Sequence, residues 1–306
     1  MATNGWNYIN VMYLEVGDLV SLGMRGTYKI IHVRPEPGQK SWFRFDMIST
    51  RNQVRINEVV SGRTQLCAWK LYNEAQRYIK KVCQKFGVDE THGLEHALKV
   101  KSQLEHCLER DTTFHLDDDR QHDLILAALF HDIDDHKYFP SDSHNALDFL
   151  KTKVTPESTE RILRWIGYIS MSKWGNDVPP EAITCPWVLW PRYCDRIEAV
   201  GHEGLTRMLD FSHQRGLPDF VSTTPKPTTE EELMSYVTPQ RLETYRESGG
   251  VSKSSIDHIY DKLLHICDVT TGSSYLDQKL REGKKELVEV CLNYGRYGNI
   301  GSYAVI

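Results

Sequence analysis

Residues 124–132 read LILAALFHD, and this stretch decides how the rest of the chain is interpreted. Its first seven residues are apolar, and His131 follows Leu124 by seven positions and Ala127 by four, so it shares their face of a helix. Alone, a histidine on such a face is usually a core residue with satisfied hydrogen bonds. The adjoining Asp132 changes this interpretation, because a carboxylate beside a buried imidazole costs desolvation energy unless a cation or a strong donor is present.

Apolar residues repeat with the helical period on both sides of this stretch. The pattern predicts helices over about 71–86, 94–108, 156–169, 256–267 and 276–291. After residue 65 we find no convincing strand. The fold class is therefore mainly α, with a helical domain over residues 66–306.

Residues 14–60 follow a period of two instead, which is typical of strands. Tyr28, Ile30 and His32 are expected on one face of a strand. Lys29, Ile31 and Val33 are expected on the other face. Glycine and proline turn signals separate the strands at hairpin-like intervals. We predict a small antiparallel β module of the SH3-like type over residues 1–65, with a role in binding or oligomerisation.

Three segments interrupt the helical pattern. Residues 171–192 are rich in proline and tryptophan, which predicts an ordered loop that could act as a lid. Residues 216–250 resemble an insertion with at most one short helix. The tail from residue 293 onward is rich in glycine and tyrosine and has no clear period, so it stays unassigned.

Composition narrows the classes of function. The 306 residues include 37 Lys and Arg against 42 Asp and Glu, a net charge of −5, which argues against binding of long nucleic acids. We find neither a secretion signal nor an apolar run of membrane-spanning length, so no membrane partner is expected. The seven scattered cysteines form no C-x-x-C pair, which favours reduced thiols and a cytoplasmic location.

Two further residues complete a candidate metal site. His96 lies on another apolar stripe, one helical turn before Val100, and Asp195 lies near the start of a later helix. Two imidazoles and two carboxylates suit a divalent cation that keeps positions open for water and substrate oxygens.

The order His96, His131 and Asp132, Asp195 resembles the H…HD…D signature of the HD-domain metal-dependent phosphohydrolases. Four blocks carry the resemblance, namely THGLEHALKV (91–100), AALFHDIDDHKYF (127–139), YCDRIEAVGHEGLTR (193–207) and the stretch 259–290. The third block resembles the DADRLDAIG-type block of small bacterial stand-alone members. Lys99 replaces a usual Arg and Cys194 a usual Ala, and neither change removes a ligand. The resemblance covers about residues 68–295 and leaves the β module unexplained.

The resemblance implies an all-helical HD fold and hydrolysis of a nucleotide phosphoester or phosphoanhydride. Within this subgroup, the typical reaction converts a (deoxy)nucleoside triphosphate to the monophosphate and pyrophosphate. One divalent ion per chain, Mn²⁺ or Mg²⁺, would be held by His96, His131, Asp132 and Asp195. Asp135 would shuttle a proton, and Lys137 would meet a phosphate oxygen.

We assign substrate binding to four further residues, His92, Lys262, Arg281 and Arg196. Each assignment has a structural alternative. His92 could be a polar group at a helix start, and Arg196 could be paired inside the fold. The segment 134–137 that carries Asp135 and Lys137 could equally be a solvated polar turn.

Other functions fit the same residues. The chain could be a non-catalytic nucleotide sensor, or it could hydrolyse an alarmone or a nucleoside monophosphate. A dinuclear oxygenase needs two more histidines before Asp195, and only His136 and His144 lie in that interval, so a single metal is favoured. The expected partners are a small phosphorylated substrate and, through the β module, a second copy or another protein.

Overall fold

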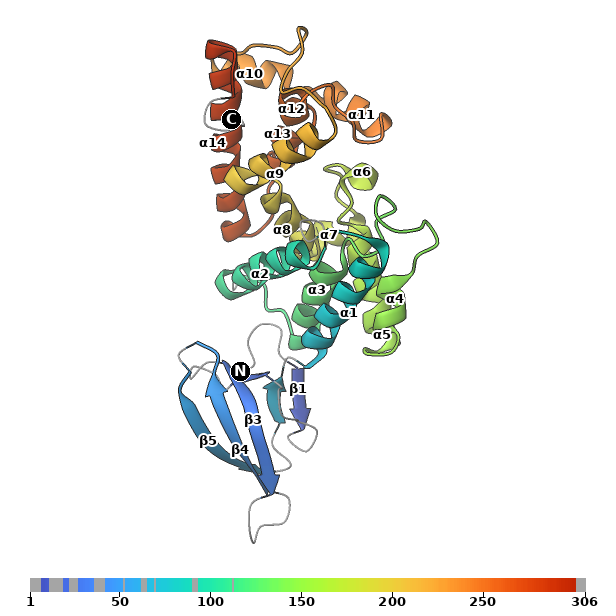
Figure 1. The fold of residues 1–306 in the computed structure, drawn as a ribbon, viewed down its shortest axis with the longest axis vertical. Coiled ribbons are helices and arrows are strands. Elements are labelled where there is room, and N and C mark those ends of the chain that lie inside the picture. The colour runs from blue at the N-terminus through green and yellow to red at the C-terminus, as the bar shows by residue number, and fades with distance from the viewer. Residues whose placement is uncertain are drawn as a thin grey trace. The chain divides into compact units, whose positions relative to one another are not determined.

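The structure is a computed structural model that describes residues 7–10, 19–21, 27–35, 42–51, 53–61, 65–68, 70–89, 93–111 and 113–300. In these ranges the last strand ends at Ala68 and the first helix begins at Lys70 (Figure 1). The prediction of a mainly helical chain that begins with an antiparallel sheet is confirmed. The chain divides into two compact units, residues 1–98 with 112–163, and residues 99–111 with 164–306.

The sheet has six antiparallel strands in the order β1-β6-β2-β3-β4-β5. The strands are β1 Asn7–Asn10, β2 Leu19–Ser21, β3 Thr27–Pro35, β4 Trp42–Ser49, β5 Arg55–Ser61 and β6 Gln65–Ala68. Strands β2 to β5 form a meander, and β6 returns to pair with β2. Strand β6 therefore extends three residues beyond the boundary expected at residue 65.

A β-bulge in β3 changes which side chains share a face. Tyr28 and Ile30 are buried and Lys29 is exposed, as the alternation predicts. The register then shifts between Ile30 and His32, so that His32 pairs with Asp46 and is exposed. The expectation that His32 lies on the face of Tyr28 is wrong, because the extra residue of the bulge turns the strand by one position.

The first unit contains the helices that carry the LILAALFHD stretch. They are α1 Lys70–Phe86, the start of α2 Leu94–Arg110, α3 Asp118–Phe130, α4 Asn145–Leu150 and the start of α5 Pro156–Gly167. Asp117 caps α3 by accepting a hydrogen bond of 2.8 Å from the Arg120 amide. All seven residues from 124 to 130 are buried, so α3 is enclosed on every side rather than amphipathic.

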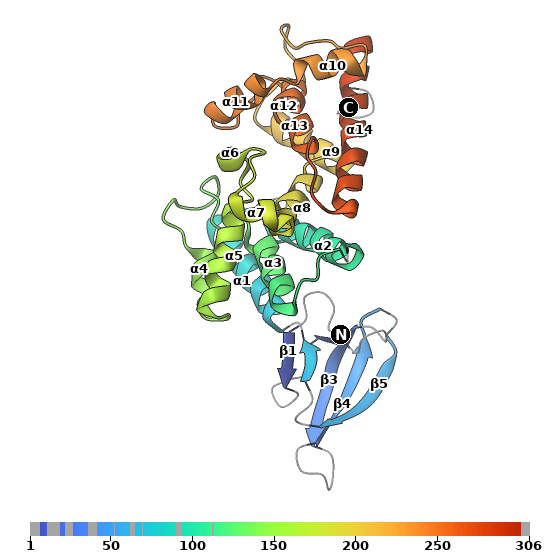
Figure 2. The same ribbon diagram turned by 180° about the vertical axis from the view of Figure 1, so that it is seen from behind.

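The second unit contains the rest of α2 and α5 and the later helices. They are α6 Met171–Trp174, α7 Pro180–Thr184, η3 Pro186–Leu189, α8 Trp190–Glu198, α9 Gly201–Gln214, α10 Glu230–Tyr236, α11 Pro239–Glu247, α12 Ser255–His258, η4 Ile259–Leu263, α13 Leu264–Cys267 and α14 Ser274–Tyr297. Helix α14 packs against α8, α9 and α10, and both ribbon views show it beside α9 and α10 (Figures 1 and 2). The predicted helix over 256–267 is interrupted by one π-helical turn, η4.

A buried carboxylate joins the end of α2 to the start of α14. Asp111 accepts hydrogen bonds from the amide and the hydroxyl of Ser274, both at 3.0 Å, and from the hydroxyl of Ser273. Ser273 is also the N-cap of α14. Asp111 and Ser273 thus accept hydrogen bonds from two of the orphan amides at the start of this 24-residue helix, those of Ser274 and Leu276.

Two of the interrupting segments contain more structure than expected. The loop 171–192 is ordered, as predicted, and Trp187 packs edge-on against Trp165 with ring centroids 5.5 Å apart. The insertion 216–250 holds two short helices, not at most one. Thr229 and Thr238 cap them, because each side chain accepts a hydrogen bond from the backbone amide three residues on, that of Glu232 and that of Arg241.

The tail that lacked a clear period continues α14 as far as Tyr297. A glycine inside this helix, Gly295, allows a close approach of the insertion. A Cβ atom at Gly295 would lie 1.8 Å from the carbonyl oxygen of Pro227. Gly295 therefore reflects packing, whereas Gly298 ends α14 in the left-handed conformation.

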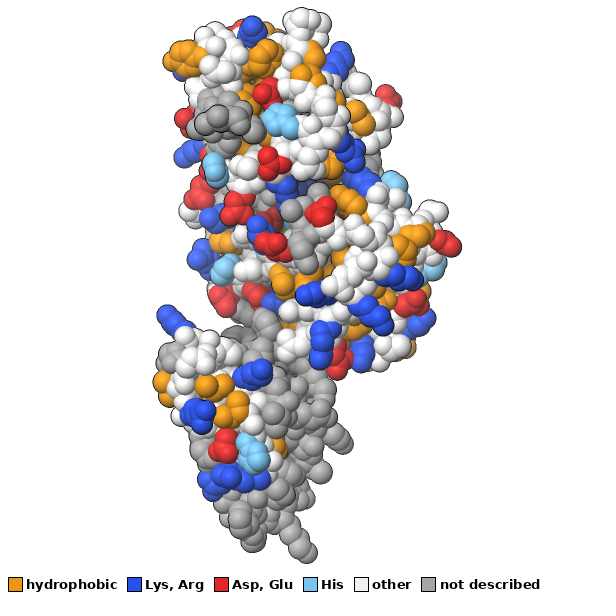
Figure 3. Space-filling model, viewed as in Figure 1, with side chains coloured by type: hydrophobic (Ala, Val, Ile, Leu, Met, Phe, Trp, Pro, Cys, Tyr) orange, Lys and Arg blue, Asp and Glu red, His pale blue; other side chains and the backbone are white. Residues whose placement is uncertain are grey.

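The mixed charges of the surface and the free thiols of the cysteines agree with what the composition predicts. Figure 3 shows acidic and basic side chains intermixed over the helical surface in view. The six cysteines whose side chains are described are free thiols, and five of them are buried. Within the described residues, the helices lack the combination of length and apolar character that crossing a bilayer requires.

We predict that Gly295→Ala lowers the free energy of unfolding by about 1–3 kcal/mol, because the new methyl group overlaps Pro227. Gly167→Ala is the matched control, since a methyl group added there would meet no atom within 4 Å. That change should be neutral or stabilise by up to about 1 kcal/mol. Urea unfolding followed by circular dichroism measures both, and equal effects of the two changes would contradict the close contact.

A second prediction concerns the packing of α1 on α3. The Tyr72 hydroxyl donates to Nδ1 of His122 at 2.5 Å, and burial lowers the pKa of His122 to about 4. His122 is therefore protonated near pH 6.5 in the unfolded chain but only near pH 4 in the folded chain. The free energy of unfolding falls as the pH falls between these two values.

The expected loss due to His122 is up to about 3 kcal/mol between pH 6.5 and pH 4. His122→Gln keeps an acceptor for Tyr72 but does not titrate. Its unfolding free energy should therefore fall less steeply than that of the wild-type protein, as measured by urea unfolding at several pH values. Parallel pH profiles of the two proteins would rule out this contribution of His122.

Candidate metal centre

His131 follows directly after the buried helix α3 and keeps helical backbone angles as its C-cap. Its side chain is 1% exposed. The Nδ1–H donates to the carbonyl oxygen of Ala128 at 2.9 Å. Because a carbonyl oxygen only accepts, this bond places the proton of the neutral ring on Nδ1 and leaves a lone pair on Nε2.

His96 approaches this lone pair from α2. The two Nε2 atoms lie 3.3 Å apart, and the rings meet edge-on with centroids 5.1 Å apart. Oδ2 of Asp132 lies 3.2 Å from Nε2 of His131 and 3.7 Å from Nε2 of His96. One ligand atom from each of the three residues lies within 4.8 Å of the others.

This arrangement fits a divalent metal ion. Two nitrogens bound at about 2.0–2.1 Å to a tetrahedral ion lie about 3.3 Å apart, which is the separation of the two Nε2 atoms. Both histidines are buried, whereas the Asp132 side chain is 34% exposed. The group is therefore closed on the protein side and open toward water on the side of Asp132, as a catalytic metal site requires.

The turn that carries Asp132 is fixed by its neighbour Asp134. The Asp134 carboxylate accepts hydrogen bonds from the Asn145 amide at 2.7 Å, from the Asn145 side chain at 3.0 Å and from the Ala146 amide at 3.0 Å. The Asn145 side chain also donates to the carbonyl oxygen of Ile133 at 3.0 Å. We call this pair the Asp134–Asn145 clamp.

Sequence analysis did not find the clamp. Asp134 was considered only as part of a polar turn, and Asn145 was not considered. A helix cap usually comes from the residue just before the helix, whereas α4 is capped from 11 residues upstream. The sequence signal that could have helped is the absence of a capping Ser, Thr, Asp or Asn at His144, directly before α4.

Asp135 and Lys137 lie on the same turn and contact each other. The Asp135 carboxylate accepts a hydrogen bond of 3.0 Å from the Lys137 amide, and its Oδ2 lies 3.8 Å from the Lys137 Nζ. Asp135 is 23% exposed and Lys137 is 61% exposed. His136 and His144, the two histidines considered for a second metal, are both exposed.

The remaining predicted site residues lie elsewhere in the chain. Asp195 is half-buried in α8, Lys262 is half-buried in η4, and Arg281 is exposed on α14. His92 lies outside the described residues. Among the described residues, the group of three ligands does not extend to Asp195, Lys262 or Arg281.

Arg196 is buried and contacts the loop 171–177. Its guanidinium donates to the side chain of Asn176 at 2.9 Å and to the carbonyl oxygen of Gly175. Burial and the neighbouring Arg192 lower its pKa to about 10. These contacts match the alternative in which Arg196 is paired inside the fold.

Comparison with solved structures shows what fold this chain shares. A protein from Lactobacillus plantarum has a TM-score of 0.52 and 19% sequence identity, over 72% of this chain and 95% of that chain. An HD-superfamily hydrolase from Bacillus thuringiensis reaches a TM-score of 0.47 at 16% identity, over 74% of this chain and all of that chain. At these identities the first likeness concerns the fold alone.

Comparison of sequences gives a clearer relation. No protein-family model matches the chain. "Uncharacterized protein L803" of Acanthamoeba polyphaga mimivirus is 30% identical over 221 residues, which is 66% of this chain and 88% of the viral protein. The chain therefore belongs to the same protein family as L803.

Proposed function

We propose that the chain is a divalent-metal-dependent phosphohydrolase of the HD superfamily. The observation that carries the proposal is the pair of buried histidine Nε2 atoms 3.3 Å apart with the Asp132 carboxylate beside them. The four sequence blocks that resemble HD hydrolases support it independently. We further propose a (deoxy)nucleoside triphosphate as the substrate, pyrophosphate as a product, and a cytoplasmic location.

Asp195 is proposed as the fourth ligand. Its support comes from the third sequence block, in which Asp195 takes the place of the last Asp of the H…HD…D signature. A single ion, Mn²⁺ or Mg²⁺, is proposed because His136 and His144 are exposed.

The residues of this chain would divide the reaction between them. A bound divalent ion supplies a polarised phosphoryl oxygen and a water molecule whose pKa is lowered toward about 7. Asp135 would accept the proton of the attacking water, since its carboxylate lies on the turn of Asp132. Lys137 is exposed enough to leave Asp135 and bind a phosphate oxygen.

Substrate phosphates are assigned to Lys262, Arg281 and His92, as the sequence resemblance implies. Arg196 was predicted with them, but its donors are engaged with the loop 171–177. We therefore expect Arg196 to affect substrate binding through that loop.

We also keep the SH3-like description of the β module as a proposal. In its favour, β2 to β5 form a meander and the last strand, β6, returns beside the first.

We predict that His131→Ala and Asp195→Ala each reduce nucleotide hydrolysis by at least about 100-fold, because each removes a ligand. The assay incubates the protein with Mn²⁺ or Mg²⁺ and a panel of dNTPs, NTPs and alarmones, and then separates pyrophosphate, triphosphate and orthophosphate. Chelation by EDTA should abolish turnover.

His115→Ala is the matched control for these variants, since His115 is exposed and remote in sequence from the ligands. It should keep wild-type activity. The absence of metal-dependent turnover of every phosphate compound by the wild-type protein would overturn the proposed function.

The Asp134–Asn145 clamp gives a separate prediction. Asp134→Ala should weaken Mn²⁺ binding about 10- to 100-fold, because the turn that presents Asp132 loses three hydrogen bonds. Isothermal titration calorimetry measures the affinity.

Thr229→Ala is the control for the clamp, because it removes a helix cap from α10 in the insertion and touches none of the ligands. Its Mn²⁺ affinity should equal that of the wild type. Equal losses in both variants would mean that general destabilisation, and not the position of Asp132, sets the affinity.

A further inference from the structure

The β module presents a group of cations on one face of β3, β4 and β5. In an antiparallel sheet, residues that are directly paired point to the same face. Lys29 pairs with Ile48, which pairs with Arg55, and Arg34 pairs with Arg44. Arg44 and Ile48 are four residues apart on β4, so both rows share one face.

The bulge in β3 adds His32 to this face. Without it, His32 would share the buried side with Ile30, whereas the observed register pairs it with Asp46. We call the set formed by Lys29, His32, Arg34, Arg44 and Arg55 the basic face. Arg34 and Arg44 are directly opposite each other in the register, which concentrates positive charge at this point of the sheet.

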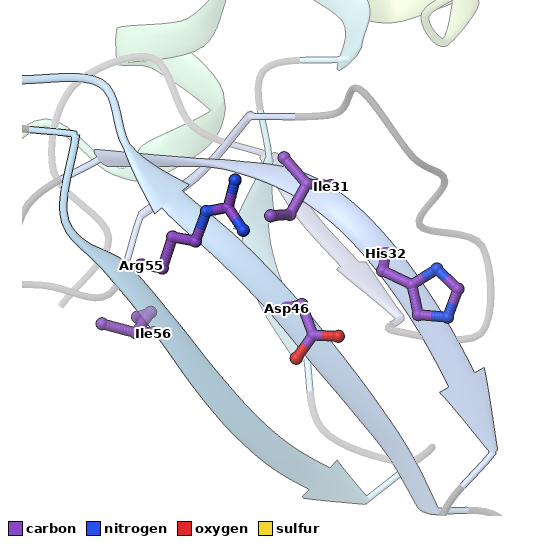
Figure 4. A pocket seen from close by; sticks show the side chains of 5 residues that line it. All are labelled: Ile31, His32, Asp46, Arg55 and Ile56. Atoms are coloured by element: carbon purple, nitrogen blue, oxygen red, sulfur yellow. The ribbon is translucent and has the colours of Figure 1, made fainter.

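A shallow depression lies within the basic face. Ile31, His32, Asp46, Arg55 and Ile56 line it, and its volume is about 340 Å³ (Figure 4). Asp46 forms an ion pair of 3.6 Å with Arg34. On the basic face the cations surround one carboxylate, Asp46, and the half-buried Ile48, whereas Ile56 pairs with Met47 on the opposite face.

This composition suits a protein partner better than a nucleic acid. Protein interfaces combine an apolar centre with a polar rim and are enriched in arginine. A nucleic-acid strand would bring phosphates against Asp46, and the described side chains of this face include no Phe, Tyr or Trp ring on which a base could stack.

The rest of the chain carries a net charge of the opposite sign. Residues 1–68 hold 8 of the 37 Lys and Arg and 5 of the 42 Asp and Glu, a net charge of +3. Residues 69–306 hold the other 29 and 37, a net charge of −8. We propose that the basic face binds the acidic helical part of a second copy of the chain. Two basic faces repel each other, so each contact joins the basic face of one chain to the helical part of the other and not to its basic face.

Sedimentation velocity of the full chain tests this interface. The wild-type protein should associate at low ionic strength and dissociate as added salt shortens the screening length from about 10 Å at 0.1 M to about 3 Å at 1 M. The double variant Arg34→Glu and Arg55→Glu should remain monomeric under both conditions. Lys80→Glu with Lys81→Glu changes the net charge equally on the exposed side of α1 and should associate at least as well as the wild type.

Mixing the proteins tests the direction of the contact. A tagged Arg34→Glu and Arg55→Glu chain keeps its acidic helical part, residues 69–306. It should therefore bind wild-type chains although it does not bind itself. Circular dichroism checks that it folds, and the neutral pair Arg34→Gln and Arg55→Gln replaces it if it does not.

Three outcomes would overturn the proposal. They are a monomeric wild-type protein at low salt, association that the basic-face variants leave unchanged, and binding of the oligonucleotide poly(dT) by the basic face without self-association. The last outcome would assign the basic face to nucleic acid instead.

Discussion

The site depends on one constraint, which is that two imidazole nitrogens and a carboxylate oxygen meet in a largely buried place. Nε2 of His131 has its lone pair fixed by the Ala128 hydrogen bond, and it faces Nε2 of His96 and the Asp132 carboxylate. Such a group is costly in a dry interior unless a shared proton or a cation occupies it. The burial of seven consecutive apolar residues in α3 offsets this desolvation cost, because they fix the helix that His131 directly follows.

Packing around the site then determines how firmly each ligand is held. His96 lies on a helix whose far end is fixed by Gln103 and Asp111, both of which bond to neighbouring helices. Asp132 lies instead on a turn, where rigidity must come from hydrogen bonds. The Asp134–Asn145 clamp supplies them. Helix packing thus positions His96, whereas hydrogen bonds to the turn position Asp132.

Sequence periodicity predicted the residues whose position follows from a repeating pattern. The sequence identifies His96 and His131 because each places an ionisable imidazole on an otherwise apolar helix face. The structure brings the two together with Asp132. Asn145 was missed because its role depends on a tertiary contact with Asp134. The exposure of His32 was missed because a bulge adds one residue without any signal in composition. The helix α11 was missed because the insertion was interpreted by its prolines and not by its capping threonines.

The contact between Asp111 and the start of α14 has a consequence for the order of events during synthesis. Asp111 and Ser273 are separated by 162 positions, whereas His96, His131 and Asp132 are made close together and early. At about 5–20 residues per second, the ribosome needs on the order of 10–30 s to deliver the partner of Asp111. The three ligands can therefore meet while the end of α2 still has a carboxylate in water, and the last long helix completes the second unit only after the residues up to Tyr297 have been made.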